Sequence, residues 1–189
     1  MRPIDKIAAR VRKCRRCRLW KGRKHAVPGE GPCPAKIMLI GQAPGRNEDE
    51  TGRPFVGRAG KFLDKMLKHA RIDRKKAYIT SVVKCFPPRN RVPRIDAIES
   101  CNQYLKEQIR LVQPKTVILL GNISIKTVLR TQDPRLGTNH GKFVKRNGIL
   151  FLLTYHPAAG MRFPTIKNRM KRDFSQLKRH LPWQSTINL

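Results

Sequence analysis

Four of the five cysteines in this 189-residue chain are spaced so that their thiolates could hold one inorganic group. Cys14 and Cys17 form a C-x-x-C pair, whereas Cys85 and Cys101 stand far from that pair and from each other. Four thiolates that converge from separate segments bind either Zn²⁺ or an iron–sulfur cluster. A zinc ribbon normally has a second C-x-x-C pair, so the wide spacing of the other two cysteines favours a cubane cluster. The alternative is a set of buried, unpaired thiols, and we interpret the remaining cysteine, Cys33, in that way.

A second group of functional side chains follows an apolar run at residues 37–40. The run predicts a buried strand, and a turn rich in Gly and Pro that contains Gln42 and Ala43 comes directly after it. Carboxylates at 48–50, the first of them Glu48, and the aromatic ring of Phe55 come next. Open α/β sheets bind ligands where strands break into such loops. We therefore expect a pocket with a floor of backbone groups, carboxylates and a ring that can stack on a flat ligand. The alternative is an ordinary loop with a solvated acidic patch.

Two further polar side chains come at the ends of predicted strands. Ser81 lies near the end of the segment 77–83, and His156 follows the segment 149–154 and precedes a proline. Because the carboxyl ends of parallel strands meet at one edge of a sheet, we expect both side chains near the Gly/Pro turn. A lone histidine is more often structural than catalytic. Its position at a strand end, opposite a Gly/Pro loop, makes His156 a candidate for catalysis.

The elements that must position these residues alternate along the chain. Apolar runs predict strands over 36–41, 77–83, 116–120 and 149–154, the last one in a hairpin with 142–148. Helices are expected over 4–13, 59–70, 95–112, 122–130 and 166–180, with Asn122 as an N-cap and a loop at 132–141. This order predicts an α/β fold, a three-layer α/β/α sandwich with a central, mostly parallel sheet of about four strands. We expect one domain over residues 1–189, with a basic C-terminal helix and a short tail from about residue 166.

The charge of the chain is strongly one-sided. Lysine and arginine number 42 against 12 acidic residues, which gives a formal net charge of +30 at pH 7. A field of this size indicates a polyanionic partner, and nucleic acid is the main candidate. No apolar run reaches the roughly 20 residues of a membrane helix, and the start is charged and amphipathic, so we expect neither a membrane anchor nor a signal peptide. We therefore expect a cytoplasmic protein. That reducing compartment disfavours a disulfide framework, and the odd number of cysteines also argues against one.

In this order and spacing, the motifs resemble those of the iron–sulfur uracil-DNA glycosylases, usually called family 4. The resemblance runs from Cys14 to about Leu181 and rests on the C-x-x-C pair, GQAPGRNEDETGRPFVGRAG, VKCFPPRNR, Cys101 and HPAA. It implies a small α/β/α fold and the excision of uracil from DNA. It also implies a [4Fe–4S] cluster held by Cys14, Cys17, Cys85 and Cys101. Because breaking an N-glycosidic bond needs no redox step, we expect the cluster to be structural.

The resemblance also implies roles for the pocket residues. Gln42 and Ala43 line the pocket and offer backbone groups to the base, and Phe55 stacks on a uracil that has flipped out of the duplex. Glu48 stands where the family has a carboxylate that positions or activates water. His156 stands where the family donates a hydrogen bond to the uracil carbonyl O2, which stabilises the departing uracil anion.

Basic side chains around the pocket are expected to contact DNA. Arg162, which follows HPAA, is expected to contact a phosphate or to act as a wedge, and Arg89 and Arg91 are expected on the DNA-facing surface.

Two positions depart from the family pattern. Many members have Glu at the position of Gln42, and many have Asn at the position of Ser81, where the amide reads the uracil edge. Serine cannot make the bidentate pair of an amide, so uracil must be read differently here.

The resulting hypothesis is a monofunctional DNA glycosylase that hydrolyses the N-glycosidic bond of uracil and leaves an abasic site. One alternative is a non-catalytic iron–sulfur nucleic-acid-binding module on the same fold, which the two departures favour. Another is a zinc-binding basic protein of RNA or DNA. The expected partner is uracil-containing DNA, double- or single-stranded, bound by a monomer away from membranes. Residues 183–189 are a weak candidate for docking a sliding clamp.

Overall fold

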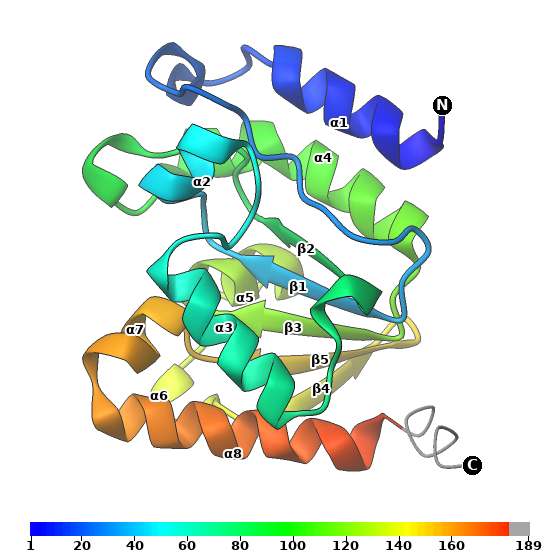
Figure 1. The fold of residues 1–189 in the computed structure, drawn as a ribbon, viewed down its shortest axis with the longest axis vertical. Coiled ribbons are helices and arrows are strands. Elements are labelled where there is room, and N and C mark those ends of the chain that lie inside the picture. The colour runs from blue at the N-terminus through cyan, green and yellow to red at the C-terminus, as the bar shows by residue number, and fades with distance from the viewer. Residues whose placement is uncertain (182–189) are drawn as a thin grey trace.

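A five-stranded sheet lies at the centre of the computed structural model, which describes residues 1–181 (Figure 1). In chain order the strands are β1 Ile37–Gly41, β2 Ala77–Ser81, β3 Thr116–Leu120, β4 Phe143–Arg146 and β5 Ile149–Thr154. Their spatial order is β2-β1-β3-β5-β4, and of the five only β4 is antiparallel to its neighbour. The predicted α/β sandwich is confirmed. The sheet has one strand more than predicted because the first arm of the predicted hairpin pairs fully with β5.

The parallel strands are apolar because both faces of the sheet are covered. Successive side chains of a strand point to opposite faces. Accordingly, Met38 and Ile40 of β1 belong to one apolar cluster, and Ile37 and Leu39 belong to the other. The strand β4 differs, since three of its four residues are exposed and it ends in Lys-Arg. Such charges keep an edge strand from pairing with another chain.

Helices form a layer on each face of the sheet (Figure 1). On one face, α4 (Ile95–Val112) and α5 (Asn122–Leu129) pack on the cluster that contains Met38, and α1 (Pro3–Lys13) contacts α4. On the other face, α3 (Arg58–His69) and α8 (Pro164–His180) pack on the cluster that contains Ile37. The short helices are α2 (Arg46–Thr51), α6 (Leu136–Asn139), α7 (Pro157–Arg162) and the 3₁₀ turns Arg18–Lys21, Arg74–Lys76 and Pro88–Asn90.

Several local predictions differ from the structure. The sequence analysis assigned no helix to the segments that form α2 and α7, because six residues are too few to show a hydrophobic period. The helix α6 interrupts the loop predicted at 132–141. The prediction that Asn122 caps a helix is wrong. Gly121 is the N-cap of α5 with φ 92°, Asn122 is the first helical residue, and no side chain caps this end.

The described part of the chain ends just after α8, at Leu181. Over residues 1–181, no helix has both the length and the apolar character that crossing a bilayer requires. The weak candidate for docking a sliding clamp, at 183–189, lies outside the described residues.

Candidate functional site

The carboxyl ends of the parallel strands open onto one cavity, on the side of the sheet edge where α2 and α7 lie (Figure 1). Five of the residues predicted from the sequence line it, and they come from the segments after β1, β2 and β5: Ala43, Glu48, Phe55, Ser81 and His156. The cavity encloses about 470 Å³, including its open mouth. Within it, the space that the centre of a water molecule can occupy is about 90 Å³, so the cavity suits a small ligand.

The aromatic ring of Phe55 rests directly on main chain. A Cβ atom added to Gly41, the last residue of β1, would lie 2.6 Å from Cζ of the ring, and one added to Gly60 would clash with the Phe55 backbone. The ring therefore requires glycine at position 41, and the backbone of Phe55 requires glycine at position 60. Phe55 itself has φ 52°, a left-handed conformation that costs a bulky residue about 1–3 kcal/mol and tends to occur at functional sites. Its ring lies 6.1 Å from that of His156, centroid to centroid, at 32°.

The imidazole of His156 is held in one tautomer by the start of α7. His156 is the N-cap of that helix, and its Nδ1 accepts a hydrogen bond from the Ala158 backbone N–H at 3.2 Å. Because Nδ1 is the acceptor, the proton of the neutral ring is on Nε2, which can donate to a ligand. Desolvation by the surrounding protein lowers the pKa of His156 to about 4, and the nearby Glu48 carboxylate only partly opposes this shift. The ring is therefore a neutral donor at neutral pH.

The carboxylate of Glu48 is fixed by three backbone groups. Its Oε1 accepts from the N–H groups of Val56 (2.8 Å) and Gly57 (2.7 Å), and its Oε2 accepts from Gly45 N–H at 3.0 Å. These bonds join the start of α2 to the segment just before α3, which contains Phe55. A carboxylate has about four lone-pair positions, so one remains on Oε2 for another donor such as water.

The other two acids of the run 48–50 do not line the cavity. Asp49 is 5% exposed and accepts from the backbone N–H groups of Lys24 and His25. Glu50 forms an ion pair with Lys24 at 2.7 Å on the surface. The expectation that all three carboxylates reach the pocket is therefore wrong, because a helix, α2, turns successive side chains in different directions.

An outer hollow adjoins the cavity and shares Ala43, Asn90, His156 and Ala158 with it. Gln42 and Arg162 line this hollow rather than the inner cavity. Gln42 is held there through its backbone, since its carbonyl accepts from Val83 N–H at 3.2 Å. Of the two departures from the family pattern, the one at Ser81 thus touches the inner cavity and the one at Gln42 touches its entrance.

Asn90 also lines the cavity, and the sequence analysis missed it. It ends the 3₁₀ turn Pro88–Asn90, in which Arg89 and Asn90 have φ of 54° and 58°. Asparagine enters this left-handed region more readily than most residues. The neighbouring Arg89 and Arg91 are exposed. An asparagine in a Pro-rich loop after a strand was the signal that could have identified it.

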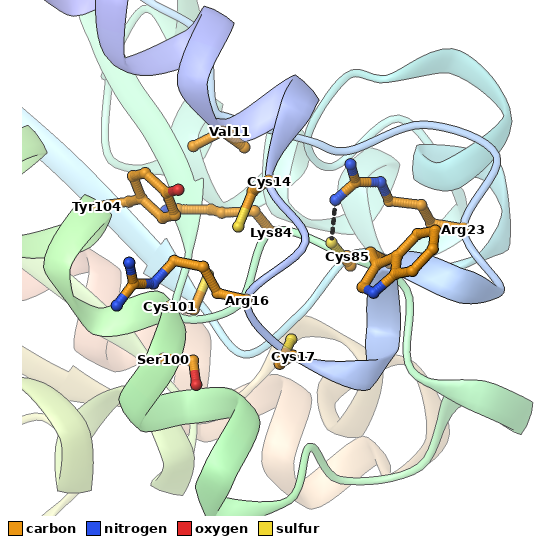
Figure 2. Close-up of a pocket in the computed structure, with 11 residues that line it drawn as sticks. Val11, Cys14, Arg16, Cys17, Arg23, Lys84, Cys85, Ser100, Cys101 and Tyr104 are labelled. Atoms are coloured by element: carbon orange, nitrogen blue, oxygen red, sulfur yellow. Dashed lines mark hydrogen bonds between the residues drawn. The ribbon is translucent and has the colours of Figure 1, made fainter.

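Four cysteines surround a second cavity, away from the first (Figure 2). Cys14 caps the C-terminal end of α1, Cys17 precedes a 3₁₀ turn, Cys85 lies in the loop after β2, and Cys101 is on α4. Cys33 does not line this cavity, and its Sγ donates to the Leu111 carbonyl at 3.3 Å. Within residues 1–181, no three His, Cys, Asp or Glu side chains are arranged to hold a single metal ion. The four thiols nevertheless line one cavity, which brings the four predicted ligands together.

The surroundings of these thiols are positively charged. Arg23 donates from Nη1 to the Sγ of Cys85 at 3.0 Å, and Lys84 also lines the cavity. Burial raises the pKa of Cys85, and it raises the pKa of Cys101 to about 11 despite the opposing effect of Lys84. Burial likewise lowers the pKa of Lys84 to about 8. Bound metal would stabilise the thiolates that burial disfavours, and these cations would offset their charge.

Comparisons with known proteins identify uracil-DNA glycosylases as relatives of this chain. A sequence model of the Uracil DNA glycosylase superfamily matches residues 28–178, a range that includes every residue named at the strand-end cavity but begins after Cys14 and Cys17. A "Type-4 uracil-DNA glycosylase" of Saccharolobus solfataricus is 44% identical over 186 residues, which cover 94% of this chain and 86% of that protein. Proteins of the same name from Sulfurisphaera tokodaii and Archaeoglobus fulgidus are 40% and 36% identical, each over 94% of this chain and over 84% and 92% of their own lengths.

Proposed function

We propose that this chain, which belongs to the type-4 uracil-DNA glycosylases of the uracil-DNA glycosylase superfamily, excises uracil from DNA in the cavity at the strand ends. The reaction hydrolyses the N-glycosidic bond and leaves an abasic site. The observation that supports this use of the cavity most directly is the pairing of a stacking ring, Phe55, with a neutral donor, His156, on one small space. The non-catalytic alternative is not favoured, because several relatives at this level of identity carry the name of the enzyme.

The base reaches the cavity by leaving the duplex. Flipping a nucleotide costs a few kcal/mol of lost stacking and pairing, which basic side chains on the flanking phosphates offset. Arg162 at the outer hollow and the exposed Arg89 and Arg91 are suited to these contacts. In the cavity, Phe55 provides the flat surface that replaces the neighbouring bases.

Bond cleavage places negative charge on the departing uracil. The Nε2–H of His156 is the donor we assign to the carbonyl O2, and a neutral imidazole performs this role without transferring its proton. Its fixed tautomer means that no reorganisation is needed as the charge develops. A donor oriented in advance in this way is the commonest large contribution to catalysis of this kind.

Glu48 is the group we assign to the attacking water. The three backbone N–H groups fix its carboxylate, so the remaining position on Oε2 accepts from a water in a defined direction. The same negative charge stabilises the oxocarbenium-like sugar that forms as uracil departs. The pocket motifs contain no lysine in a position for a Schiff base, so we propose a monofunctional enzyme without strand cleavage.

Recognition of the uracil edge falls to Ser81 and Asn90. Ser81 provides one hydroxyl, which cannot donate and accept in the paired manner of an amide. Asn90 has such an amide and lies in the loop that follows β2, the strand that ends at Ser81, and both residues line the cavity. We propose that the two together do the work of the asparagine that many family members have at position 81.

We further propose that Cys14, Cys17, Cys85 and Cys101 hold a structural [4Fe–4S] cluster. Four thiols around one space, with Arg23 and Lys84 beside them, form an appropriate donor set for an anionic group. When bound, the cluster joins the segment after α1 to the start of α4 and to the loop after β2, and its electrochemistry takes no part in the reaction. The working form we propose is a cytoplasmic monomer on uracil-containing DNA.

The test uses one purified sample for two measurements. Iron and sulfide content measures the cluster, and release of uracil from a duplex with a single uracil measures the activity. A matched duplex with thymine at the same position is the control. Uracil release without strand cleavage supports the proposal. An absence of release over several salt concentrations and temperatures overturns the enzyme, and zinc in place of iron overturns the cluster alone.

A further inference from the structure

Lys84 is a buried cation between the two cavities. Its side chain is 1% exposed and is among the largest fully buried side chains of the chain. Its Nζ donates to Thr80 Oγ1 at 2.7 Å, to the Ser81 carbonyl at 2.6 Å and to Gln108 Oε1 at 2.7 Å. Three acceptors satisfy the three protons of an ammonium group, so the site is built for the charged form.

Among the described residues, no carboxylate pairs with this charge. All three acceptors are neutral, and none of the ion pairs within residues 1–181 includes Lys84. A buried charge is costly unless an opposite charge lies near it. Lys84 lines the cysteine cavity, next in sequence to Cys85 and beside Cys101 (Figure 2). Thiolates that held an iron–sulfur cluster there would carry net negative charge and would supply an opposite charge for Lys84.

Lys84 also contacts a residue of the uracil cavity, Ser81. The Ser81 carbonyl that accepts from Lys84 belongs to the residue whose side chain lines the uracil cavity. The backbone after Ser81 continues the pairing with the pocket loop, because Val82 N–H donates to Gly41 O (2.9 Å) and Val83 N–H donates to Gln42 O (3.2 Å). One side chain therefore contacts the cysteine cavity and also fixes the strand end that forms the pocket wall.

We propose that Lys84 is a positioning residue that couples the cluster to the uracil pocket. The negative charge of the cluster stabilises the buried ammonium, and the ammonium holds the Ser81 end of β2 in place. This inference rests on the cluster proposed above. It gives the cluster an effect on the reaction that needs no electron transfer, and it predicts that loss of the Lys84 charge is felt at both cavities.

The experiment compares three variants of the full chain. Lys84→Met removes the charge and keeps much of the shape, Lys84→Arg keeps the charge, and Lys106→Met removes one exposed charge from the same helix as Cys101. The measurements are iron and sulfide content, the reduction potential of the cluster, DNA affinity and the single-turnover rate of uracil release. A potential is informative because net charge near a cluster is one of the factors that set it.

For Lys84→Met we expect a lower reduction potential or loss of iron, since a nearby cation favours the reduced, more negative cluster. We also expect a single-turnover rate lower by on the order of 10- to 100-fold, as is typical when a residue that orients a metal site or its ligands is removed. DNA affinity should stay near the wild-type value. Lys84→Arg should retain iron and recover most of the rate, and Lys106→Met should match the wild type.

Three results would overturn the inference. The first is an iron-containing Lys84→Met protein with unchanged potential and rate. The second is equal impairment of Lys84→Met and Lys84→Arg, including failure of both to fold, because then packing rather than charge is decisive. The third is a wild-type protein without iron, which overturns the cluster proposal as well. A Lys84→Met protein that fails to fold while Lys84→Arg folds with its cluster supports the inference.

Discussion

Replacing His156 by alanine removes one hydrogen-bond donor from the uracil cavity and leaves the ring of Phe55 and the carboxylate of Glu48 in place. Since Nδ1 of His156 accepts from Ala158 N–H at 3.2 Å, the donor that is lost is Nε2–H. Losing one donor to a developing anion typically costs on the order of 10²–10³ in rate, or about 2.7–4 kcal/mol. We expect the single-turnover rate to fall by this factor while DNA affinity stays near the wild-type value.

The assay is uracil release with enzyme in excess over a duplex that contains one uracil, with DNA binding measured in parallel. His69→Ala is the matched control, because His69 is an exposed histidine on α3. It should release uracil at the wild-type rate. A loss below about tenfold for His156→Ala, or an equal loss of rate and DNA affinity, refutes the donor role.

The protonation state of His156 gives a second test of the same reasoning. With its pKa lowered to about 4, the imidazole is neutral over the usual assay range, so the chemical step should not depend on its titration above about pH 5. The unfolded chain, in which the ring has the ordinary value of 6.5, binds the proton more tightly. Folding stability from this group should therefore fall as pH drops from 6.5 towards 4. A rate that rises on acidification with a midpoint near 6.5 would indicate an imidazolium donor instead.

Three other substitutions test the remaining contacts. Gly41→Ala places a methyl group 2.6 Å from Cζ of Phe55 and should displace the ring. We expect slower uracil release with unchanged DNA affinity, and an unchanged rate contradicts the role of this contact. Phe55→Ala should lose stacking of roughly 1–3 kcal/mol, measured as weaker binding of a duplex with a non-cleavable uracil nucleotide; unchanged binding contradicts the stacking role. Cys85→Ala should lower iron content and thermal stability, whereas Cys33→Ala should leave iron unchanged; a fully loaded Cys85→Ala protein would exclude that ligand.

The fold was accessible from the sequence because its main elements carry strong patterns. β1, β3 and β5 are uninterrupted apolar runs, and α3 and α4 show clear helical periods. The helix α2 could not be found in this way. Its sequence RNEDET has no apolar face, and its buried residue is Asp49, which the N–H groups of Lys24 and His25 satisfy. That contact depends on a loop more than twenty positions earlier in the chain.

The site was accessible only in part, for a related reason. Residue types at strand ends indicated Phe55, Ser81 and His156, because parallel strands gather their carboxyl ends at one edge. Asn90 reaches the cavity through a backbone turn with positive φ, which a pattern of residue types does not reveal. Lys84 resembles an ordinary surface lysine in the sequence. Only the folded chain shows that Thr80, Ser81 and Gln108 enclose its ammonium group.

The packing of Phe55 against two glycines limits how this enzyme could be redesigned. The ring lies against Gly41 and the backbone of Phe55 lies against Gly60, so this floor of the cavity has no side chain under the ring that could be trimmed to deepen it. Attempts to admit a bulkier base should leave the floor alone. They should instead vary Ser81 and Asn90, two polar residues that line the cavity away from this floor.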